Sequence, residues 1–141
     1  MTAADPAPDT LVDRMGIEIL DDDPQRLVAR MPLAGNRQMY GFLHGGASAA
    51  FAQALAAHAA AHRAGSGGRV TGQELSCTHH RAARGDGWVS GVCTPLFLGD
   101  TLATYEVAVR DERGNRVASA RLTCLLHRAA PQPEGETTAC P

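Results

Sequence analysis

The stretch GFLHGGASAAFAQALAAHAAAHRAG, residues 41–65, decides the fold of this chain. A glycine pair opens it, and neither proline nor glycine interrupts it between Gly46 and Gly65. Alanine, the strongest helix former, dominates the run, so the sequence predicts one long helix. The polar side chains before Arg63 are few: Ser48, Gln53, His58 and His62. A surface helix normally carries a polar face, so we expect this helix to be buried nearly all round by the rest of the fold.

The bulk composition limits the possible functions. The chain has 141 residues, which suits one domain with its own hydrophobic core. The net charge is −2 at pH 7 and 20% of the residues are charged. This balance lacks the strongly basic character that attracts nucleic acid or an anionic membrane. We therefore expect neither nucleic acid nor a membrane as a partner.

Cysteine spacing and the first residues indicate a cytoplasmic protein. The cysteines form no C-x-x-C pair, so we expect buried free thiols. They are Cys77, Cys93, Cys124 and Cys140. The opening MTAADPAPDT lacks the basic start and apolar core of a signal peptide, and no apolar run has membrane-spanning length. We find no metal-like His/Cys spacing and no nucleotide-phosphate loop, so neither a metal nor a bound cofactor is expected.

The ends of the chain differ in composition from its middle. Residues 1–10 are rich in proline and alanine and predict a disordered tail, and residues 129–141 predict a flexible one. Residues 11–128 then form a single domain. Within it, residues 16–20 and 26–33 indicate an antiparallel hairpin, with the polar residues between them as its turn.

Strand-like runs follow the helix and are separated by glycine-containing turns, so we expect hairpin neighbours. These runs are residues 70–83, 87–98, 101–110 and 116–128. One helix with five or six antiparallel strands predicts an α+β domain whose sheet curls around the helix, because a lone helix has no other way to bury its faces. The outer face of the sheet would meet solvent or a second subunit, and we expect an oligomer.

The helix entry offers chemistry of its own. His44, Gly45 and Gly46 place unpaired backbone N–H groups and the positive end of the helix dipole at one point. Such a point can polarise a carbonyl or hold an anion, and glycine lets a ligand approach closely. Alternatively, the glycines only let the helix start pack tightly under the sheet. The spacing alone leaves both readings open.

Gln53 is the long polar group of the third helical turn. Its neighbours on the helix surface are small: Ala49, Ala50, Ala56, Ala57 and Ala60. The backbone of a partner or a narrow substrate arm could fill this strip. Gly45 and Gln53 are eight residues apart, about 12 Å along the helix, so they cannot both touch one carbonyl. If both serve one site, they come from different subunits with antiparallel helices across a two-fold axis.

The segment LHGGASAAFAQAL, with AGNRQMYG before it and GQELSCTHHRAARGDGWVSGVCTPLFLGDTL after it, resembles the hot dog fold acyl-CoA thioesterases. The likeness is to the phenylacetate-pathway and 4-hydroxybenzoyl-CoA types, and it runs from about Gly16 to His127. It implies a curved antiparallel sheet of five to six strands wrapped around one long central helix. It also implies hydrolysis of an acyl-CoA or acyl-carrier-protein thioester at a dimer interface, in a dimer or a dimer of dimers.

The resemblance assigns roles to residues of the site. The Gly45 amide would polarise the thioester carbonyl, Gln38 would lie near the thioester, and His44 would support the loop and the helix start. The candidate substrate contacts are Gly46, Ala57, His79, Arg81 and Arg84. Of these, the two arginines lie in the stretch where related enzymes approach the CoA arm.

Gln53 stands where the family carries the Asp or Glu that acts as nucleophile or general base. A neutral amide can neither accept a proton at pH 7 nor form an acyl anhydride. Three accounts stay open. The chain is a thioesterase whose Gln53 orients water while another group or solvent takes the proton; or it binds acyl thioesters without hydrolysis or catalyses a dehydratase- or cyclase-like reaction; or it is a trapped variant.

Histidines are the remaining candidates for a base. His79 and His80 lie near a possible cleft, since adjacent strand residues face opposite ways. His58 and His62 point to a different helical face from Gln53, and we expect them to be structural or exposed. Ser48 has no readable His–Asp arrangement nearby and is expected to bond back to the chain.

Overall fold

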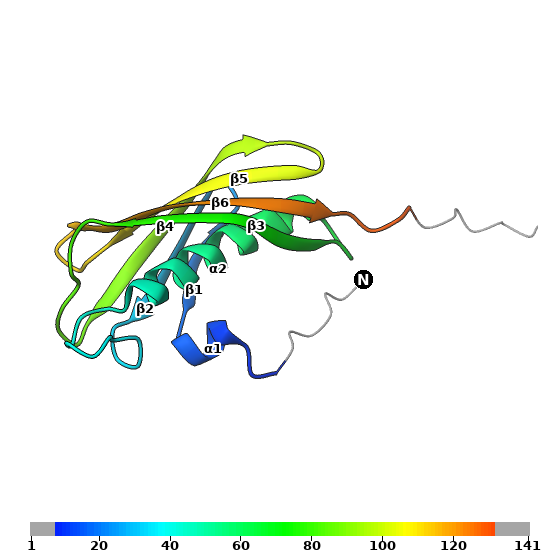
Figure 1. Cartoon of the computed structure of the whole chain (residues 1–141). Helices are drawn as coiled ribbons and strands as arrows, with labels where there is room; N and C mark the ends of the chain where they lie inside the picture. Colours follow the sequence, from blue (N-terminus) through cyan, green and yellow to red (C-terminus); the bar gives the residue numbers. More distant parts are fainter. Residues whose placement is uncertain (1–7, 132–141) are drawn as a thin grey trace, which may run out of the picture.

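Helix α2, Gly45–Ala64, lies against a six-stranded antiparallel sheet in the computed structural model (Figure 1). The structure describes residues 8–131. The strands, in chain order, are β1 Glu18–Asp23, β2 Arg26–Pro32, β3 Arg69–His79, β4 Trp88–Leu98, β5 Leu102–Arg110 and β6 Arg116–His127. A short helix, α1 Leu11–Met15, precedes them. The prediction of five to six antiparallel strands around one long helix is confirmed.

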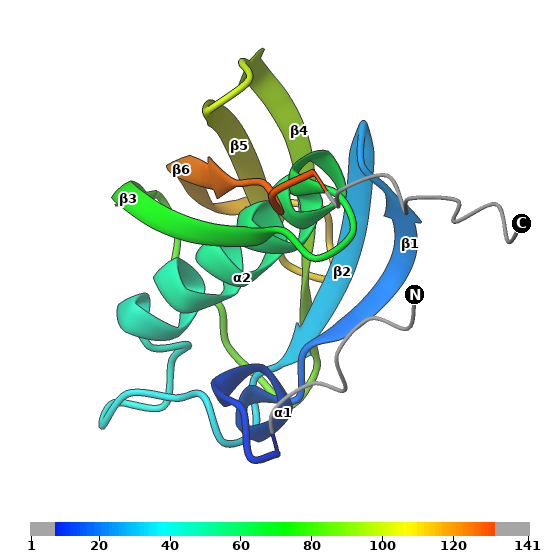
Figure 2. The same cartoon turned by 90° about the vertical axis from the view of Figure 1, so that its right-hand side faces the viewer.

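The sheet curls around α2, with the β1–β2 hairpin on one side of the helix and β3 with β6 on the other (Figure 2). The strand order is β1-β2-β4-β5-β6-β3. Strands β4, β5 and β6 follow one another as antiparallel neighbours, as the sequence predicts. Helix α2 contacts β3 and β6 most, at one edge of the sheet, and the central strands β4 and β5 less.

The prediction that β3 and β4 form a hairpin is wrong. Strand β3 pairs with β6 at one edge of the sheet, whereas β4 pairs with β2 and β5. Tight hairpins close with loops of about two to five residues, whereas residues 80–87 form a longer connection that passes the end of the sheet. The hydrophobic pattern locates each strand in the sequence but does not state which strand lies beside it.

The first hairpin closes later than predicted. Residues 21–23 belong to β1, and the turn is formed by Pro24 and Gln25, whose N–H donates to Asp23 Oδ1 over 2.9 Å. Every residue of β1 is exposed, because it is an edge strand of the sheet. Consecutive aspartates at an exposed edge therefore do not interrupt the strand.

The core forms between α2 and the sheet. Phe51 and Leu55 are fully buried on the side of the helix that faces β4. Gly91 permits this contact, because a Cβ there would lie 2.7 Å from Leu55 Cδ2 and 2.8 Å from Phe51 Cε1. The helix thus packs directly on the backbone of β4.

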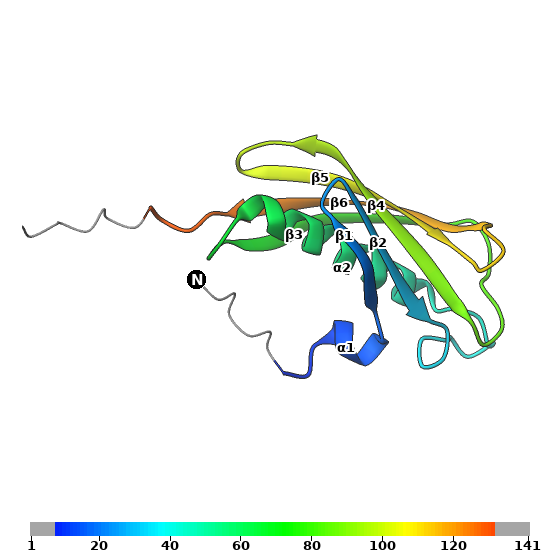
Figure 3. The same ribbon diagram turned by 180° about the vertical axis from the view of Figure 1, so that it is seen from behind.

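The prediction that α2 is buried nearly all round is wrong for the described chain. The sheet covers one side of the helix, and the other side stays open (Figures 2 and 3). The exposed residues of α2 beyond its first turn are Gln53, His58, Ala61 and His62. A single curved sheet covers only part of a cylinder, so a helix rich in alanine can lack a polar face and still leave one side uncovered.

The thiols agree in part with the prediction of buried free cysteines. Cys93 and Cys124 are buried and Cys77 is half-buried, and all three are free. Burial raises the pKa of Cys93 to about 12 and that of Cys124 to about 11. Cys140 lies outside the described residues.

The ordered elements begin at Leu11 and end at His127. The predicted tails, residues 1–10 and 129–141, fall largely outside residues 8–131. Within that described part of the chain, no helix is long and apolar enough to cross a membrane.

Candidate functional site

His44 is the N-cap of α2. Its backbone is extended (φ −66°, ψ 132°), and its Nδ1 accepts the N–H of Gly46 over 2.8 Å. The His44 carbonyl accepts the N–H groups of Ala47 and Ser48 over 2.9 and 3.1 Å. The N–H of Gly45 finds no acceptor among the described residues. One backbone donor at the positive end of the helix dipole therefore stays available for a ligand.

Asn36 holds the loop that leads into this helix. Its buried side chain donates to the carbonyls of Met15 and Pro32 over 2.8 Å each, and its own carbonyl accepts the His44 N–H over 2.8 Å. The loop is thereby tied to α1 and β2, which fixes the position of His44. Asn36 was not among the predicted site residues. An asparagine in the loop eight residues before the N-cap His44 is the signal that could have found it, because short amides bond readily to nearby backbone.

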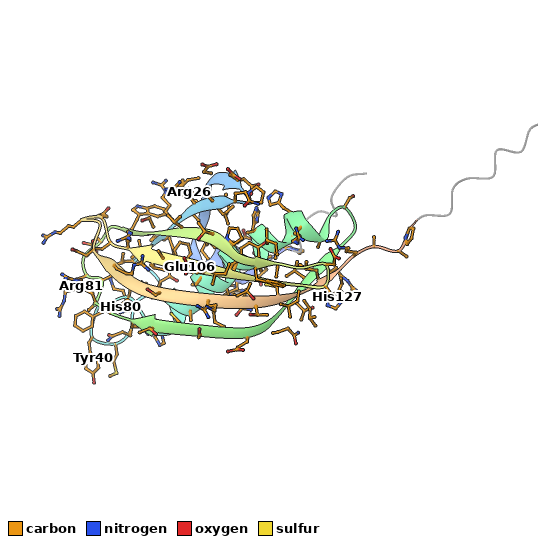
Figure 4. The ribbon with its side chains drawn as sticks, turned by 90° about the horizontal axis from the view of Figure 1, so that it is seen from above. Arg26, Tyr40, His80, Arg81, Glu106 and His127 are labelled. Carbon is orange, nitrogen blue, oxygen red and sulfur yellow. The ribbon has the colours of Figure 1, made fainter. Side chains whose placement is uncertain are left out.

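A cavity of about 350 Å³ opens where α2 begins and β3 ends. Its polar lining residues are Gln38, Ser48, His79, His80 and Arg81, together with the backbone of Gly45. Four predicted site residues meet here: Gln38, Gly45, His79 and Arg81. His80 and Arg81 lie at the same end of the molecule as Tyr40, whereas His127 lies at the opposite end (Figure 4). None of the described residues that line this cavity carries a carboxylate.

His79 covers Gly45. Its Nε2 lies 3.1 Å from the Gly45 carbonyl oxygen and 3.7 Å from Cys77 Sγ. An added Cβ at Gly45 would lie 3.1 Å from the imidazole ring, closer than most Cβ contacts. Glycine therefore allows the close packing of His79 at the helix start, which agrees with the packing interpretation of the glycine pair. A ring that donates from Nε2 to this carbonyl has only Nδ1 left to accept a proton.

Gln38 takes part in the turn before the helix. Its Oε1 accepts the N–H of Tyr40, and its backbone N–H donates to the Phe42 carbonyl over 2.8 Å. With Oε1 occupied, the side-chain NH₂ is the group that Gln38 can offer to a ligand in the cavity.

Gln53 lies outside this cavity. It is exposed on the open face of α2, beside Gly72 of β3, where an added Cβ would lie 3.3 Å from Gln53 Nε2. Ala57, one turn further along, is half-buried on the helix. Within one chain the structure thus separates Gly45 from Gln53, as the spacing predicts.

The other predicted contacts surround the helix entry. His44 and Gly46 line a second pocket, of about 450 Å³. Arg84 lines a third, of about 610 Å³, and its guanidinium lies 4.0 Å from the centre of the Phe42 ring. Arg81 lines both this third pocket and the 350 Å³ cavity, so it lies between them. The predicted residues occupy neighbouring pockets and not one.

A separate cluster lies toward the other end of α2. The Nε2 atoms of His58 and His62 lie 2.9 and 2.8 Å from Asp22 Oδ1. The hydrogen bond with His62, followed by the charge of His58, lowers the pKa of the Asp22 carboxyl. Both histidines are exposed, as expected. The prediction that the chain lacks metal-like spacing overlooked this pair, whose four-residue interval places both rings on one side of a helix.

Comparisons with known proteins agree with this architecture. The family model of the thioesterase superfamily matches residues 40–118, which include the helix entry, α2 and the strands from β3 to β5. Proofreading thioesterase EntH of Cronobacter turicensis is 45% identical over 91 residues, covering 64% of this chain and 66% of the relative. EntH of Cronobacter sakazakii is 43% identical over 91 residues, which again cover 64% of this chain and 66% of the relative. The match thus spans just under two thirds of these relatives.

Solved structures match over most of the chain. A thioesterase of Haemophilus influenzae has a TM-score of 0.78 and 26% identity, and the match covers 90% of this chain and 89% of that one. AziG of S. sahachiroi has a TM-score of 0.80 and 29% identity, with 85% and 98% covered. With the family match, these likenesses confirm the predicted hot dog fold.

Proposed function

Because this chain belongs to the thioesterase superfamily, we propose that it hydrolyses an acyl thioester, with the Gly45 N–H polarising the thioester carbonyl. The observation that carries the proposal is the N–H of Gly45 at the start of α2, which has no acceptor within residues 8–131 and lies beside a cavity of about 350 Å³. A donor fixed by the helix and its N-cap needs no reorganisation as negative charge develops on the carbonyl oxygen. Such donors are worth about 10²- to 10³-fold in rate.

The reaction then needs a water molecule on the thioester carbon. Water attacks the carbonyl carbon, the C–S bond breaks, the thiol leaves, and the proton of the water goes to the leaving sulfur or to solvent. Gln53 of a second copy of the chain orients this water through its amide. The open face of α2 and the unpaired edge of β3 support this arrangement, since both surfaces lie uncovered in the described chain.

We propose a homodimer, or a dimer of dimers, as the active form. Two antiparallel α2 helices would bring Gly45 of one copy near Gln53 of the other and create two equivalent sites. Size-exclusion chromatography with light scattering tests this. A folded monomer at micromolar concentration would rule out the shared site.

The substrate is an acyl-CoA or an acyl-carrier-protein thioester, hydrolysed in the cytoplasm without a cofactor. The curated relatives named proofreading thioesterases support the thioester class. Arg81 and Arg84 line the pocket of about 610 Å³ together with Arg113 and the carboxylates of Asp111 and Glu112, and Arg81 also lines the 350 Å³ cavity. We propose that the arginines bind the phosphates of a CoA or carrier-protein arm. Comparing CoA and carrier-protein forms of one acyl group would distinguish the two.

A second candidate function is acyl-thioester binding without hydrolysis, or a dehydratase- or cyclase-like reaction. Gln53 in place of a carboxylate favours it, as does a cavity lining without Asp or Glu. Two measurements on a panel of acyl thioesters separate the two candidates. Thiol release measures hydrolysis, and calorimetry measures binding. Tight binding with no thiol release would reject hydrolysis.

The carbonyl-polarising role can be tested by a substitution that removes the backbone N–H of residue 45. Gly45→Pro deletes the N–H, and proline suits the first helical position after an extended residue such as His44. Gly45→Ala is the matched control, because it adds the same Cβ beside His79 and keeps the N–H. We expect the proline variant to have about 10²- to 10³-fold lower kcat/KM than the alanine variant. Equal values in the two variants would exclude the Gly45 N–H from catalysis.

A further inference from the structure

Three side chains that the thioester site does not use converge near the C-terminal half of α2. Asp22 comes from the edge strand β1, and His58 and His62 come from α2, 36 and 40 residues later. Both Nε2 atoms approach the same carboxylate oxygen, over 2.9 and 2.8 Å. All three ligand atoms lie within 4.8 Å of one another.

Local structure explains the convergence. Residues four apart on a helix lie on the same face, so the side chains of His58 and His62 extend from α2 in the same direction. The rings meet edge to face, with centroids 5.6 Å apart. Asp22 pairs with Leu27 in the β1–β2 hairpin, which curls beside the helix (Figure 3). The Asp22 carboxylate therefore lies within hydrogen-bond distance of both histidine rings.

The distances suit a small metal ion. Ligand atoms bound tetrahedrally at about 2.0 Å lie about 3.3 Å apart, only slightly more than the present 2.8 and 2.9 Å. The side chains of His62, His58 and Asp22 are 41%, 42% and 52% exposed. They can therefore move apart by the few tenths of an ångström that a metal ion requires without disturbing the core. Two imidazoles and one carboxylate are the ligand set that zinc and its neighbours prefer, whereas magnesium and calcium prefer oxygen ligands alone.

We propose that Asp22, His58 and His62 bind one divalent transition-metal ion, with Zn²⁺ as the best match and at least one coordination position left for water. The ion would join α2 to the edge strand β1. Within one chain, His58 lies 13 residues beyond Gly45, about 20 Å along the helix axis, so the ion would not contact the Gly45 N–H of its own chain. The proposal does not depend on thioester hydrolysis.

The test is a titration of the full-length, metal-stripped protein with Zn²⁺ by calorimetry and with Co²⁺ by visible absorption. We expect one ion per chain, a Co²⁺ spectrum of low coordination number, and a higher Tm in the presence of Zn²⁺. His58→Ala and Asp22→Asn should each weaken binding by more than the roughly 10- to 100-fold that loss of an outer-shell partner costs.

Two variants serve as controls. Asp21→Asn removes the neighbouring carboxylate of β1, and His127→Ala removes an exposed histidine at the C-terminal end of β6. Both should bind the ion as the native protein does, and circular dichroism checks that every variant is folded. The proposal is overturned if the His58→Ala/His62→Ala double variant binds Zn²⁺ as tightly as the native chain. It is equally overturned if the native chain binds none, in which case the three side chains form a hydrogen-bonded cluster only.

Discussion

The two faces of α2 share an alanine-rich composition but lie in opposite environments. The face toward the sheet carries Phe51 and Leu55, which are fully buried on the backbone of β4. The open face carries Gln53, His58 and His62, which are exposed. Small residues let another surface approach the helix closely. For the face toward the sheet, that surface is the backbone of β4 in the same chain. We therefore expect changes on the sheet face to affect mainly stability, and changes on the open face to affect mainly the proposed hydrolysis.

The largest expected effect tests the open face. Gln53→Glu supplies the carboxylate that a general base requires, and we expect thioester hydrolysis to rise by about 10²- to 10⁴-fold. Thiol release from acyl-CoA substrates measures it. Ala61→Glu, which adds a carboxylate elsewhere on the exposed surface of α2, is the control and should leave the rate unchanged. An unchanged rate for Gln53→Glu would mean that the chemistry does not take place beside this residue.

The sheet face should respond in stability. Phe51→Ala removes a fully buried ring, and such changes cost about 3–5 kcal/mol in the free energy of unfolding. Urea denaturation at one protein concentration measures it. Ala61→Ser on the exposed surface should stay within about 0.5 kcal/mol of the native protein. If the two variants were equally stable, the proposed division between the faces would be wrong.

A smaller loss is expected from adding a methyl group under the helix. The Cβ of Gly91→Ala would lie 2.7 Å from Leu55 Cδ2, an overlap that costs about 1–3 kcal/mol. Adding Leu55→Ala removes one of the overlapping atoms. The double variant should therefore lose less than the sum of the two single losses, as a double-mutant cycle can measure. Strict additivity would contradict close packing between Gly91 and Leu55.

The smallest effect concerns thiol reactivity. Burial raises the pKa of Cys93 to about 12 and of Cys124 to about 11, so both thiols stay protonated at pH 8 and carry little of the reactive thiolate. In a Cys140→Ser background, we expect an alkylating reagent to leave both unmodified in the folded protein and to modify both in urea. Peptide mapping by mass spectrometry measures the difference. Rapid modification of Cys93 in the folded state would show that this part of the core opens.

Much of the fold could be read from local patterns. The alanine run between Gly46 and Gly65 predicts α2 because helix propensity acts residue by residue. The strand runs were located by alternation and turn residues, which are equally local. The neighbour of β3 was predicted wrongly, because strand pairing depends on contacts between residues far apart in sequence, such as Leu75 with Leu122. Local patterns do not contain that information.

The candidate site shows the same division. The entry through Gly45 was located by its glycines, and the resemblance to a family placed Gln38 near the thioester. His79 was expected near a cleft because adjacent strand residues face opposite ways. Asn36, which anchors the loop, was missed because its two acceptors belong to α1 and β2. The cluster of Asp22 with His58 and His62 was missed for a similar reason, since the carboxylate comes from a different element.

The sequence by itself determined the single long helix, the alternating strands, the helix entry with its free backbone donor, and the absence of a carboxylate at position 53. Each of these depends on the identity of a residue and its close neighbours. Tertiary packing alone leaves one face of α2 uncovered by residues 8–131, places His79 over Gly45, and brings Asp22 to the histidine pair. These features arise from how a curved sheet of limited width meets a cylindrical helix, and side-chain contacts between distant segments exist only after that packing.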